Sequence, residues 1–132
     1  MNNPNNPCIF CSIRKNELIF ENNFAYASRD SYPVSKFHSL VVPKRCIKNY
    51  FELNDEEVLA CNDLIKKLKQ KIISEDDTVK GFNIGTNAGT AAGQSVFHCH
   101  IHVIPRREGD VKNPQGGVRS VIPSKQHYIR KK

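Results

Sequence analysis

The pattern of hydrophobic and polar positions predicts one long helix between two groups of short strands. Short apolar or alternating runs bounded by Asn, Gly and Pro are typical of strands. Five such runs occur, at residues 17–20, 23–28, 39–43, 81–86 and 96–104. The Glu21-Asn22 pair between the first two runs indicates a hairpin. Pro43 and Pro105 are expected to end the third and fifth strands, because proline cannot donate a hydrogen bond to a sheet.

An amphipathic helix is expected to begin after Asn54. This residue is a favourable N-cap, and the three acidic residues that follow it lie where the helix dipole stabilises negative charge. Apolar side chains then recur at intervals of three and four residues, at Val58, Cys61, Ile65, Leu68 and Ile72. This spacing predicts about five turns packed by one face on a sheet. Together the elements predict an α+β fold with an antiparallel sheet of about five strands.

Length and composition are those of one compact domain. The chain has 132 residues, 39% of them hydrophobic, and no apolar run is long enough to cross a bilayer. Residues 1–7 are rich in Asn and Pro and are expected to be disordered, without the basic and apolar regions of a signal peptide. The odd number of five cysteines favours a reducing, cytoplasmic location over a secreted disulfide framework.

Positive charge is concentrated at the end of the chain. Residues 105–132 hold eight of the 20 Lys and Arg residues but only two of the 13 Asp and Glu residues. We therefore expect a folded domain at residues 8–110 and a basic C-terminal segment at residues 111–132. Such a segment attracts nucleotides, nucleic acid or an anionic membrane surface, but it is equally compatible with a terminus kept soluble by its charge.

Three of the five histidines lie in one short stretch, at His98, His100 and His102. Alternate residues of a strand share a face, so these imidazoles are expected on one face, with Cys99 and Ile101 facing the core. Three polar side chains in register are hard to explain by packing, because buried polar groups need partners. Two interpretations remain open: ligands for a catalytic metal, or a nucleophilic imidazole with neighbours that orient it and bind an anion.

A Gly- and Ala-rich loop directly precedes these histidines. Gly85, Gly89 and Gly93 punctuate it, and such a loop lets main-chain N–H groups approach an oxyanion closely. The loop is neither a Walker loop nor a Gly-x-Gly-x-x-Gly fingerprint. Beside three aligned imidazoles, it indicates phosphate binding.

These residues resemble the signature of the histidine triad family. Residues 93–106, Gly-Gln-Ser-Val-Phe-His-Cys-His-Ile-His-Val-Ile-Pro-Arg, are similar to the family's His-φ-His-φ-His-φ-φ motif with its Gly-Gln-Ser/Thr-Val lead-in. Residues 37–44 are similar to its Gly-His-x-Leu-Val-x-Pro-Lys strand. Asp30 lies thirteen residues before Pro43, where the family carries an acidic or amide residue. The resemblance covers about residues 8–110 and implies the histidine triad fold.

The resemblance implies cleavage at the α-phosphate of nucleoside phosphoramidates, dinucleoside polyphosphates or adenylylated conjugates, by subunits that commonly form homodimers. Carried over by position, His100 attacks the α-phosphorus to form a nucleotidyl-histidine intermediate, and His102 hydrogen-bonds the phosphate, with His98 as the third triad residue. A neutral imidazole is a capable nucleophile at pH 7, so no metal is required for the chemical step. Nucleotide contacts are expected from Asp30 on the ribose hydroxyls, and from Asn87, Gly93, Gln94, Ser95 and Arg106.

Cys8 and Cys11 form a Cys-x-x-Cys pair, a spacing shared by zinc knuckles and redox pairs. Part of the histidine triad family carries this pair and completes a zinc site with the His of a Pro-Lys-x-His pattern and with the first triad His. Here Cys46 stands where the former His is usual. The resemblance therefore implies a structural zinc site of Cys8, Cys11, Cys46 and His98, because thiolate and imidazole both suit tetrahedral zinc. The other two cysteines are expected in the core.

A second class of function remains open beside a nucleotide hydrolase or transferase. The alternative is a basic, zinc-containing protein that binds nucleic acid through its C-terminal segment, with a deadenylase acting on nucleic-acid ends as an intermediate version. The histidine triad favours the enzyme, because the triad specifies a chemical reaction, whereas the basic C-terminal segment supplies only charge. The basic segment has no aromatic residue beyond Tyr128 to stack on bases, which also favours a small substrate. No membrane partner is expected.

Overall fold

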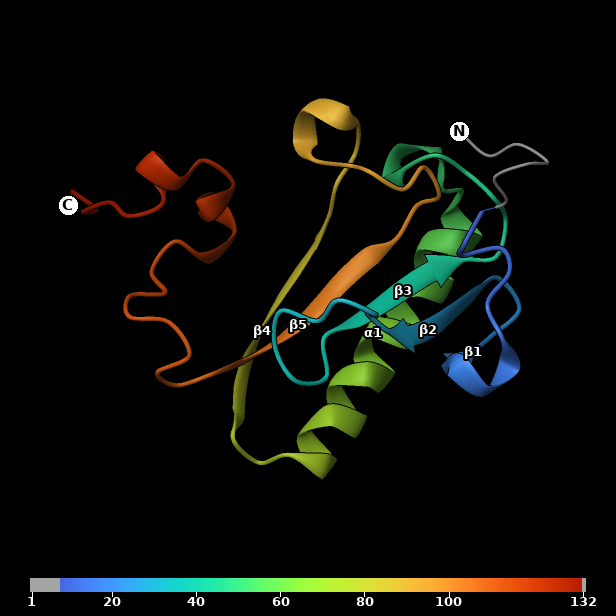
Figure 1. Ribbon diagram of the computed structural model, residues 1–132, viewed down its shortest axis with the longest axis horizontal. Helices are drawn as coiled ribbons and strands as arrows, with labels where there is room; N and C mark the ends of the chain where they lie inside the picture. The colour runs from blue at the N-terminus through green and yellow to red at the C-terminus, as the bar shows by residue number, and fades with distance from the viewer. Residues whose placement is uncertain (1–7, 132) are drawn as a thin grey trace.

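The protein folds as one antiparallel sheet with one long helix packed on it, in a computed structural model that describes residues 8–131 (Figure 1). The strands are β1 (Leu18–Glu21), β2 (Ala25–Arg29), β3 (Ser39–Pro43), β4 (Val79–Thr86) and β5 (Ile101–Arg107), and the helix is α1 (Asp55–Glu75). Short 3₁₀ helices are η1 (Lys15–Glu17), η2 (Tyr50–Glu52), η3 (Thr90–Ala92), η4 (Gly117–Val121) and η5 (Pro123–Lys125). The strand order is β1-β2-β3-β5-β4, which confirms the predicted α+β fold. The disorder predicted for residues 1–7 lies outside the described residues.

Asn22 closes the predicted hairpin between β1 and β2. Its side-chain oxygen accepts hydrogen bonds from the main-chain N–H groups of Phe24 (3.1 Å) and Ala25 (2.9 Å), as an Asx turn requires. Its side-chain amide donates to the carbonyl of Ala60 in α1 (3.1 Å), so the turn is also fixed to the helix. The hairpin is confirmed, and β3 ends at Pro43 as expected.

The long helix begins at the predicted N-cap. The side chain of Asn54 accepts from the N–H of Glu57 (2.9 Å), whose carboxylate accepts from the N–H of Asn54 (2.9 Å), a capping box. The apolar pattern predicts Ile65 on the buried face, but Leu64 occupies its centre and Ile65 its margin. The helical period of 3.6 residues places Leu64 in line with the other buried side chains, Cys61, Leu68 and Ile72. This face packs on β2, β3 and β5.

β5 begins later in the chain than the sequence predicts. The strand expected at residues 96–104 lies at Ile101–Arg107, and Pro105 lies inside it opposite Phe82 of β4. The pairing of β3 with β5 reaches only Val103, so Pro105 has a neighbouring strand, β4, on one side alone. The missing N–H of Pro105 is tolerated because no strand on the other side needs a hydrogen bond from it. The expectation that Pro105 ends the strand is therefore wrong.

The C-terminal segment, residues 111–131, extends beyond the β4 edge of the sheet (Figure 1). It folds back on itself, because the side chain of Gln115 donates to the carbonyl of Tyr128 (2.8 Å) and accepts from its N–H (3.2 Å). The Tyr128 ring also lies near the guanidinium groups of Arg119 (4.6 Å) and Arg130 (5.5 Å). Within residues 8–131, no helix has the length and apolar character needed to cross a membrane.

Candidate active site and metal centre

The three triad histidines divide into two environments. Only His102 lies within β5, whereas His98 and His100 precede the strand, because the N–H of Cys99 donates to the carbonyl of Ile47 (2.8 Å) outside the sheet. His98 is fully buried, while His100 and His102 are half-buried with their ring centroids 5.3 Å apart. The expectation of one strand carrying all three is therefore wrong, but His100 and His102 remain neighbours.

Hydrogen bonding leaves one nitrogen of His100 available. Its Nδ1 lies 2.8 Å from the carbonyl oxygen of His98, so Nδ1 carries the proton and donates it. A neutral imidazole has only one N–H, and Nε2 of His100 therefore presents a lone pair. The ring of Phe10 packs against His100 with 4.9 Å between centroids, which limits its rotation. The arrangement suits a nucleophile.

A fourth histidine, His38 at the start of β3, determines which nitrogen of His102 carries a proton. The N–H of Val34 donates to Nδ1 of His38 (3.1 Å), so the proton of His38 is on Nε2. That Nε2–H group lies 2.9 Å from Nδ1 of His102, which must accept. His102 therefore carries its proton on Nε2 and can donate it. The carboxylate of Asp30 lies 3.3 Å from Nε2 of His38 and 3.7 Å from Nδ1 of His102.

Burial keeps both rings of this pair neutral. It lowers the pKa of His38 below its usual value of 6.5, with the negative charge of Asp30 acting in the opposite direction. Burial also lowers the pKa of His102, assisted by His100 and His38 and opposed by Asp30. At pH 7 the donor and acceptor pattern described above is therefore maintained.

The glycine-rich loop is braced from within by Gln94. Its side-chain oxygen accepts from the N–H of Gly89 (2.8 Å), and its amide donates to the carbonyls of Lys48 (2.6 Å) and Val96 (3.1 Å). Because Gln94 is buried and these bonds use its polar atoms, it acts in this structure as a brace for the loop. Three other expected phosphate-binding residues lie on the same stretch of chain, Asn87, Gly93 and Ser95. Their contacts with a nucleotide stay predictions.

The predicted zinc ligands lie together beside the triad. The ligand atoms of Cys8, Cys11, Cys46 and His98 are all within 4.8 Å of one another. Nδ1 of His98 lies 3.1 Å from Sγ of Cys8 and 3.4 Å from Sγ of Cys11, and its Nε2–H donates to the carbonyl of Pro43 (2.7 Å). This is the pattern of a metal-ligating histidine, whose second nitrogen donates to a main-chain carbonyl.

The chemistry of these side chains fits zinc. Three thiols and one imidazole nitrogen form a closed Cys₃His set. Partial loss of hydration raises the pKa of Cys11 to about 12, and the neighbouring Cys8 and Cys46 contribute in the same direction. Three thiolates this close are favourable only beside a cation, and a zinc ion would supply that charge. The other two cysteines, Cys61 and Cys99, are buried in the core as predicted.

The cluster of Asp30, His38 and His102 has a similar spacing but does not fit a metal ion. If Nε2 of His38 bound a metal, a neutral ring would carry its proton on Nδ1. That proton would face the N–H of Val34, which donates to the same atom. Two donors would then oppose each other, so this cluster is a hydrogen-bond network.

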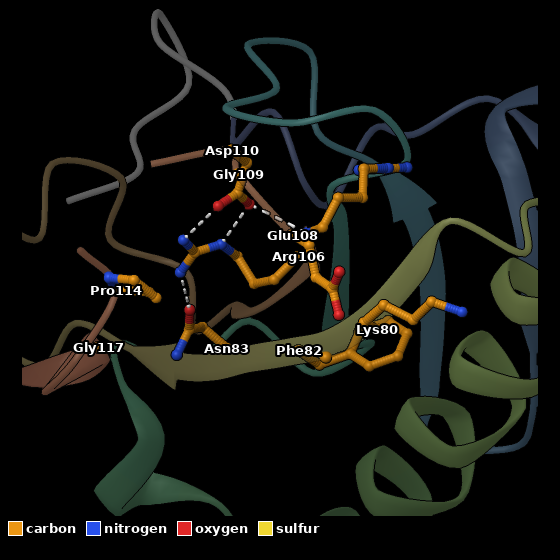
Figure 2. A pocket seen from close by; sticks show the side chains of 11 residues that line it. Lys80, Phe82, Asn83, Arg106, Glu108, Gly109, Asp110, Pro114 and Gly117 are labelled. Atoms are coloured by element: carbon orange, nitrogen blue, oxygen red, sulfur yellow. Dashed lines mark hydrogen bonds and ion pairs between the residues drawn. The ribbon is translucent and has the colours of Figure 1, made fainter. Parts of the chain in front are cut away.

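Arg106 lies away from the triad. It is near the end of β5, on the wall of a pocket of about 310 Å³ between the β4–β5 strands and the C-terminal segment (Figure 2). Its guanidinium binds both carboxylate oxygens of Asp110 (2.7 and 2.8 Å) and the side-chain oxygen of Asn83 (2.6 Å). Its contact with the phosphates of a nucleotide stays a prediction.

Comparison with known proteins agrees with the fold. An antiparallel sheet that brings four histidines together beside a glycine-rich loop is the arrangement expected of a histidine triad protein, and residues 13–109 match the HIT domain. An uncharacterized HIT-like protein of Methanocaldococcus jannaschii is 40% identical over 108 residues, covering 78% of this chain and 81% of that protein. The adenosine 5'-monophosphoramidase of Schizosaccharomyces pombe is 36% identical over 103 residues, with coverages of 75% and 74%. The chain belongs to the HIT family.

A solved structure of the same family adds to this comparison. The crystal structure of a zinc-bound histidine triad family protein from Mycobacterium smegmatis matches with a TM-score of 0.70 and 32% sequence identity. The match covers 78% of this chain and 77% of that protein. The Cys₃His cluster described above is consistent with zinc.

Proposed function

We propose that the protein is a nucleotide hydrolase or nucleotidyl transferase that cleaves at the α-phosphate of its substrate. The observation that carries this proposal is the hydrogen-bond pattern of the histidines, which gives His100 a lone pair on Nε2 and His102 a proton on Nε2. Membership of the HIT family supports hydrolase activity. Nucleoside phosphoramidates are the first substrate class to test, because a relative is named an adenosine monophosphoramidase.

The chemical step follows from these two nitrogens. Nε2 of His100 attacks the α-phosphorus, and the bond from phosphorus to the leaving group breaks with its electron pair on the departing nitrogen or oxygen. His102 donates its Nε2–H group to a phosphate oxygen, while main-chain N–H groups of the glycine-rich loop bind the others. Water then displaces the imidazole and releases a nucleoside monophosphate. His98 positions the nucleophile through its carbonyl group.

Asp30 has two roles in this proposal. One carboxylate oxygen accepts from the N–H of Tyr32 (2.8 Å), and the other faces His38 and His102. There its negative charge raises the pKa of both rings, against the effect of burial. The partly exposed carboxylate also binds the ribose hydroxyl groups, as the family resemblance implies.

A structural zinc held by Cys8, Cys11, Cys46 and His98 forms part of the proposal. The ion would hold the N-terminal loop, the segment after β3 and the triad together, and no step of the reaction runs through it. We also propose a cytoplasmic homodimer. β4 is an edge strand with an exposed Ile84, and the neighbouring C-terminal segment exposes Val118, Val121 and Ile122, so apolar surface is available there for a second copy.

The test is turnover of a panel of nucleoside phosphoramidates, dinucleoside polyphosphates and adenylylated conjugates. We expect His100→Ala to abolish turnover and the nucleotidyl-protein adduct while retaining binding of a mononucleotide, because only the nucleophile is removed. Adduct formation is measured by intact mass after rapid acid quench. The control is His127→Ala, in the C-terminal segment, which should turn over substrate as the wild type does. Near-normal turnover by His100→Ala would refute the mechanism.

A further inference from the structure

The segments that carry the metal ligands also contact the residues proposed to perform the chemistry. Phe10, between Cys8 and Cys11, packs against the ring of His100. His98 binds the same ring through its carbonyl group. Opening of this cluster would therefore release both groups that fix the orientation of the nucleophile.

The segment that carries Cys46 makes a second connection to the site. The carbonyl of Ile47 accepts from the N–H of Cys99 (2.8 Å), next to the triad. The carbonyl of Lys48 accepts from the side chain of Gln94 (2.6 Å), which braces the phosphate loop. The metal centre is therefore linked to the nucleophile and to the loop that is proposed to bind the phosphate.

The three cysteine residues of the cluster differ in their exposure to solvent. Cys8 is buried beside His98, whereas Cys11 and Cys46 are exposed. Cys46 stands where part of the family carries a histidine, so this chain places a second exposed cysteine residue beside Cys11. Exposed cysteine sulfurs with thiolate character are the ones that oxidants reach first.

We propose that Cys11 and Cys46 form an oxidation site through which a peroxide opens the metal centre and inactivates the enzyme. The inference rests on the proposed zinc site and on the proposed role of His100. The thiolate of Cys11 attacks one oxygen of hydrogen peroxide, which leaves a sulfenic acid and hydroxide. The thiolate of Cys46 then attacks that sulfur and displaces a second hydroxide. The two sulfurs have lost two electrons to the peroxide, and the neutral disulfide no longer holds zinc.

The remaining cysteines do not compete in this reaction. Cys61 and Cys99 are both enclosed in the core, with 2% and 1% of their surface exposed. The reaction is therefore confined to the metal centre.

The experiment exposes the full-length, zinc-loaded protein to hydrogen peroxide and follows three quantities. A chromogenic chelator measures released zinc, peptide mapping without reduction identifies the disulfide, and a phosphoramidate assay measures turnover. We expect zinc release, a Cys11–Cys46 disulfide and loss of turnover to share one time course. A thiol reductant with added zinc should reverse all three.

Cys46→His separates the oxidation site from the metal site. Histidine retains a zinc ligand at this position, as in the family pattern, but it removes the sulfur that forms the disulfide. We expect this variant to release zinc several-fold more slowly than the wild type under the same peroxide exposure. Cys61→Ala removes a thiol elsewhere and should release zinc at the wild-type rate.

Three outcomes would overturn the proposal. These are a wild-type disulfide joining Cys8 to Cys11, retention of zinc by oxidised wild-type protein, and equal rates of zinc loss in wild type and Cys46→His. Absence of zinc from freshly purified, reduced protein would refute the zinc site as well. If no substrate were turned over, the proposed function would fail, but zinc release and the disulfide map would still decide the oxidation reaction.

Discussion

Phe37 has a backbone conformation that glycine adopts more easily. It is the one non-glycine residue with a positive φ (72°) within residues 8–131. The N–H of His38 donates to the carbonyl of Ser35 (3.1 Å), and a positive φ at the third residue of such a turn is the mark of type II. This explains why the family pattern carries Gly before the His. Packing of the ring on the core and the Arg29 guanidinium, 5.0 Å from its centroid, offset the strain.

We therefore expect Phe37→Gly to be more stable than Phe37→Ala. Both variants lose the packing of the half-buried ring, but only alanine keeps the strain of the left-handed conformation, which is about 1 kcal/mol. Urea unfolding measures the difference. At Ala88, which has no positive φ, Ala88→Gly should instead be neutral or destabilising. An alanine variant at position 37 that is as stable as the glycine variant would show that the turn carries no strain.

His38 should make the stability of the protein depend on pH. Its pKa is below 6.5 in the folded state because the ring is buried. The unfolded chain therefore binds a proton at higher pH than the folded protein, and the free energy of unfolding decreases as the pH falls from about 6.5 toward the folded-state pKa. We expect His38→Asn to weaken this dependence in urea titrations between about pH 5 and pH 7. Equal slopes for wild type and His38→Asn would contradict the assignment.

The sequence alone predicts a chemical role for some residues of the site but not for others. Three imidazoles at alternate positions indicate a nucleophile or metal ligands without any structure. His38 could not be given a role, because its partner His102 lies 64 positions later in the chain. Only the pairing of β3 with β5 brings Leu40 opposite His102 and the two rings together. Strand pairing between distant segments is not encoded in local periodicity.

At the scale of elements, local signals located the helix and the hairpin but not the start of β5. The N-cap of α1 and the turn at Asn22 depend on neighbouring residues, so their sequence signals are sufficient. Polar and apolar residues alternate in the segment before β5 as they do in a strand. However, His98 lies against three cysteines, and the N–H of Cys99 donates to the carbonyl of Ile47. These tertiary contacts override the alternation.

The glycine-rich loop gives a prediction at the same scale. We expect Gln94→Met to decrease stability by about 2 kcal/mol, because its three main-chain partners lose buried hydrogen bonds. It should also decrease kcat/KM, because the N–H groups of the loop are no longer fixed. Thermal unfolding and phosphoramidate turnover measure the two effects. The control is Gln115→Met, which removes similar hydrogen bonds from an exposed residue and should change neither quantity. A Gln94→Met variant with the stability and kcat/KM of the wild type would show that the loop needs no brace.

At the scale of the whole molecule, the basic C-terminal region is less available to polyanions than its charge suggests. Arg106 is bound by Asp110, and Arg107 donates to Asp76 (3.0 Å) and to the carbonyl of Lys36 (3.1 Å). These two arginines therefore close a turn and join β5 to the end of α1. Composition could not reveal this, because it counts charges without their partners.

Removal of the last residues of the chain tests whether the protein acts on a small substrate or binds a nucleic acid. Ile129 is 93% exposed. Within residues 8–131, the side chain of Arg130 donates a hydrogen bond only to the hydroxyl group of the neighbouring Tyr128. We therefore expect truncation after Tyr128 to leave kcat/KM for a phosphoramidate unchanged. Oligonucleotide binding, measured by fluorescence anisotropy at several salt concentrations, should be weak with or without these residues. Tight binding that weakens steeply with salt and disappears on truncation would favour the nucleic-acid function. Each contact with a phosphate releases counterions, and it therefore adds about 0.9 to the magnitude of the slope of log K against log salt concentration.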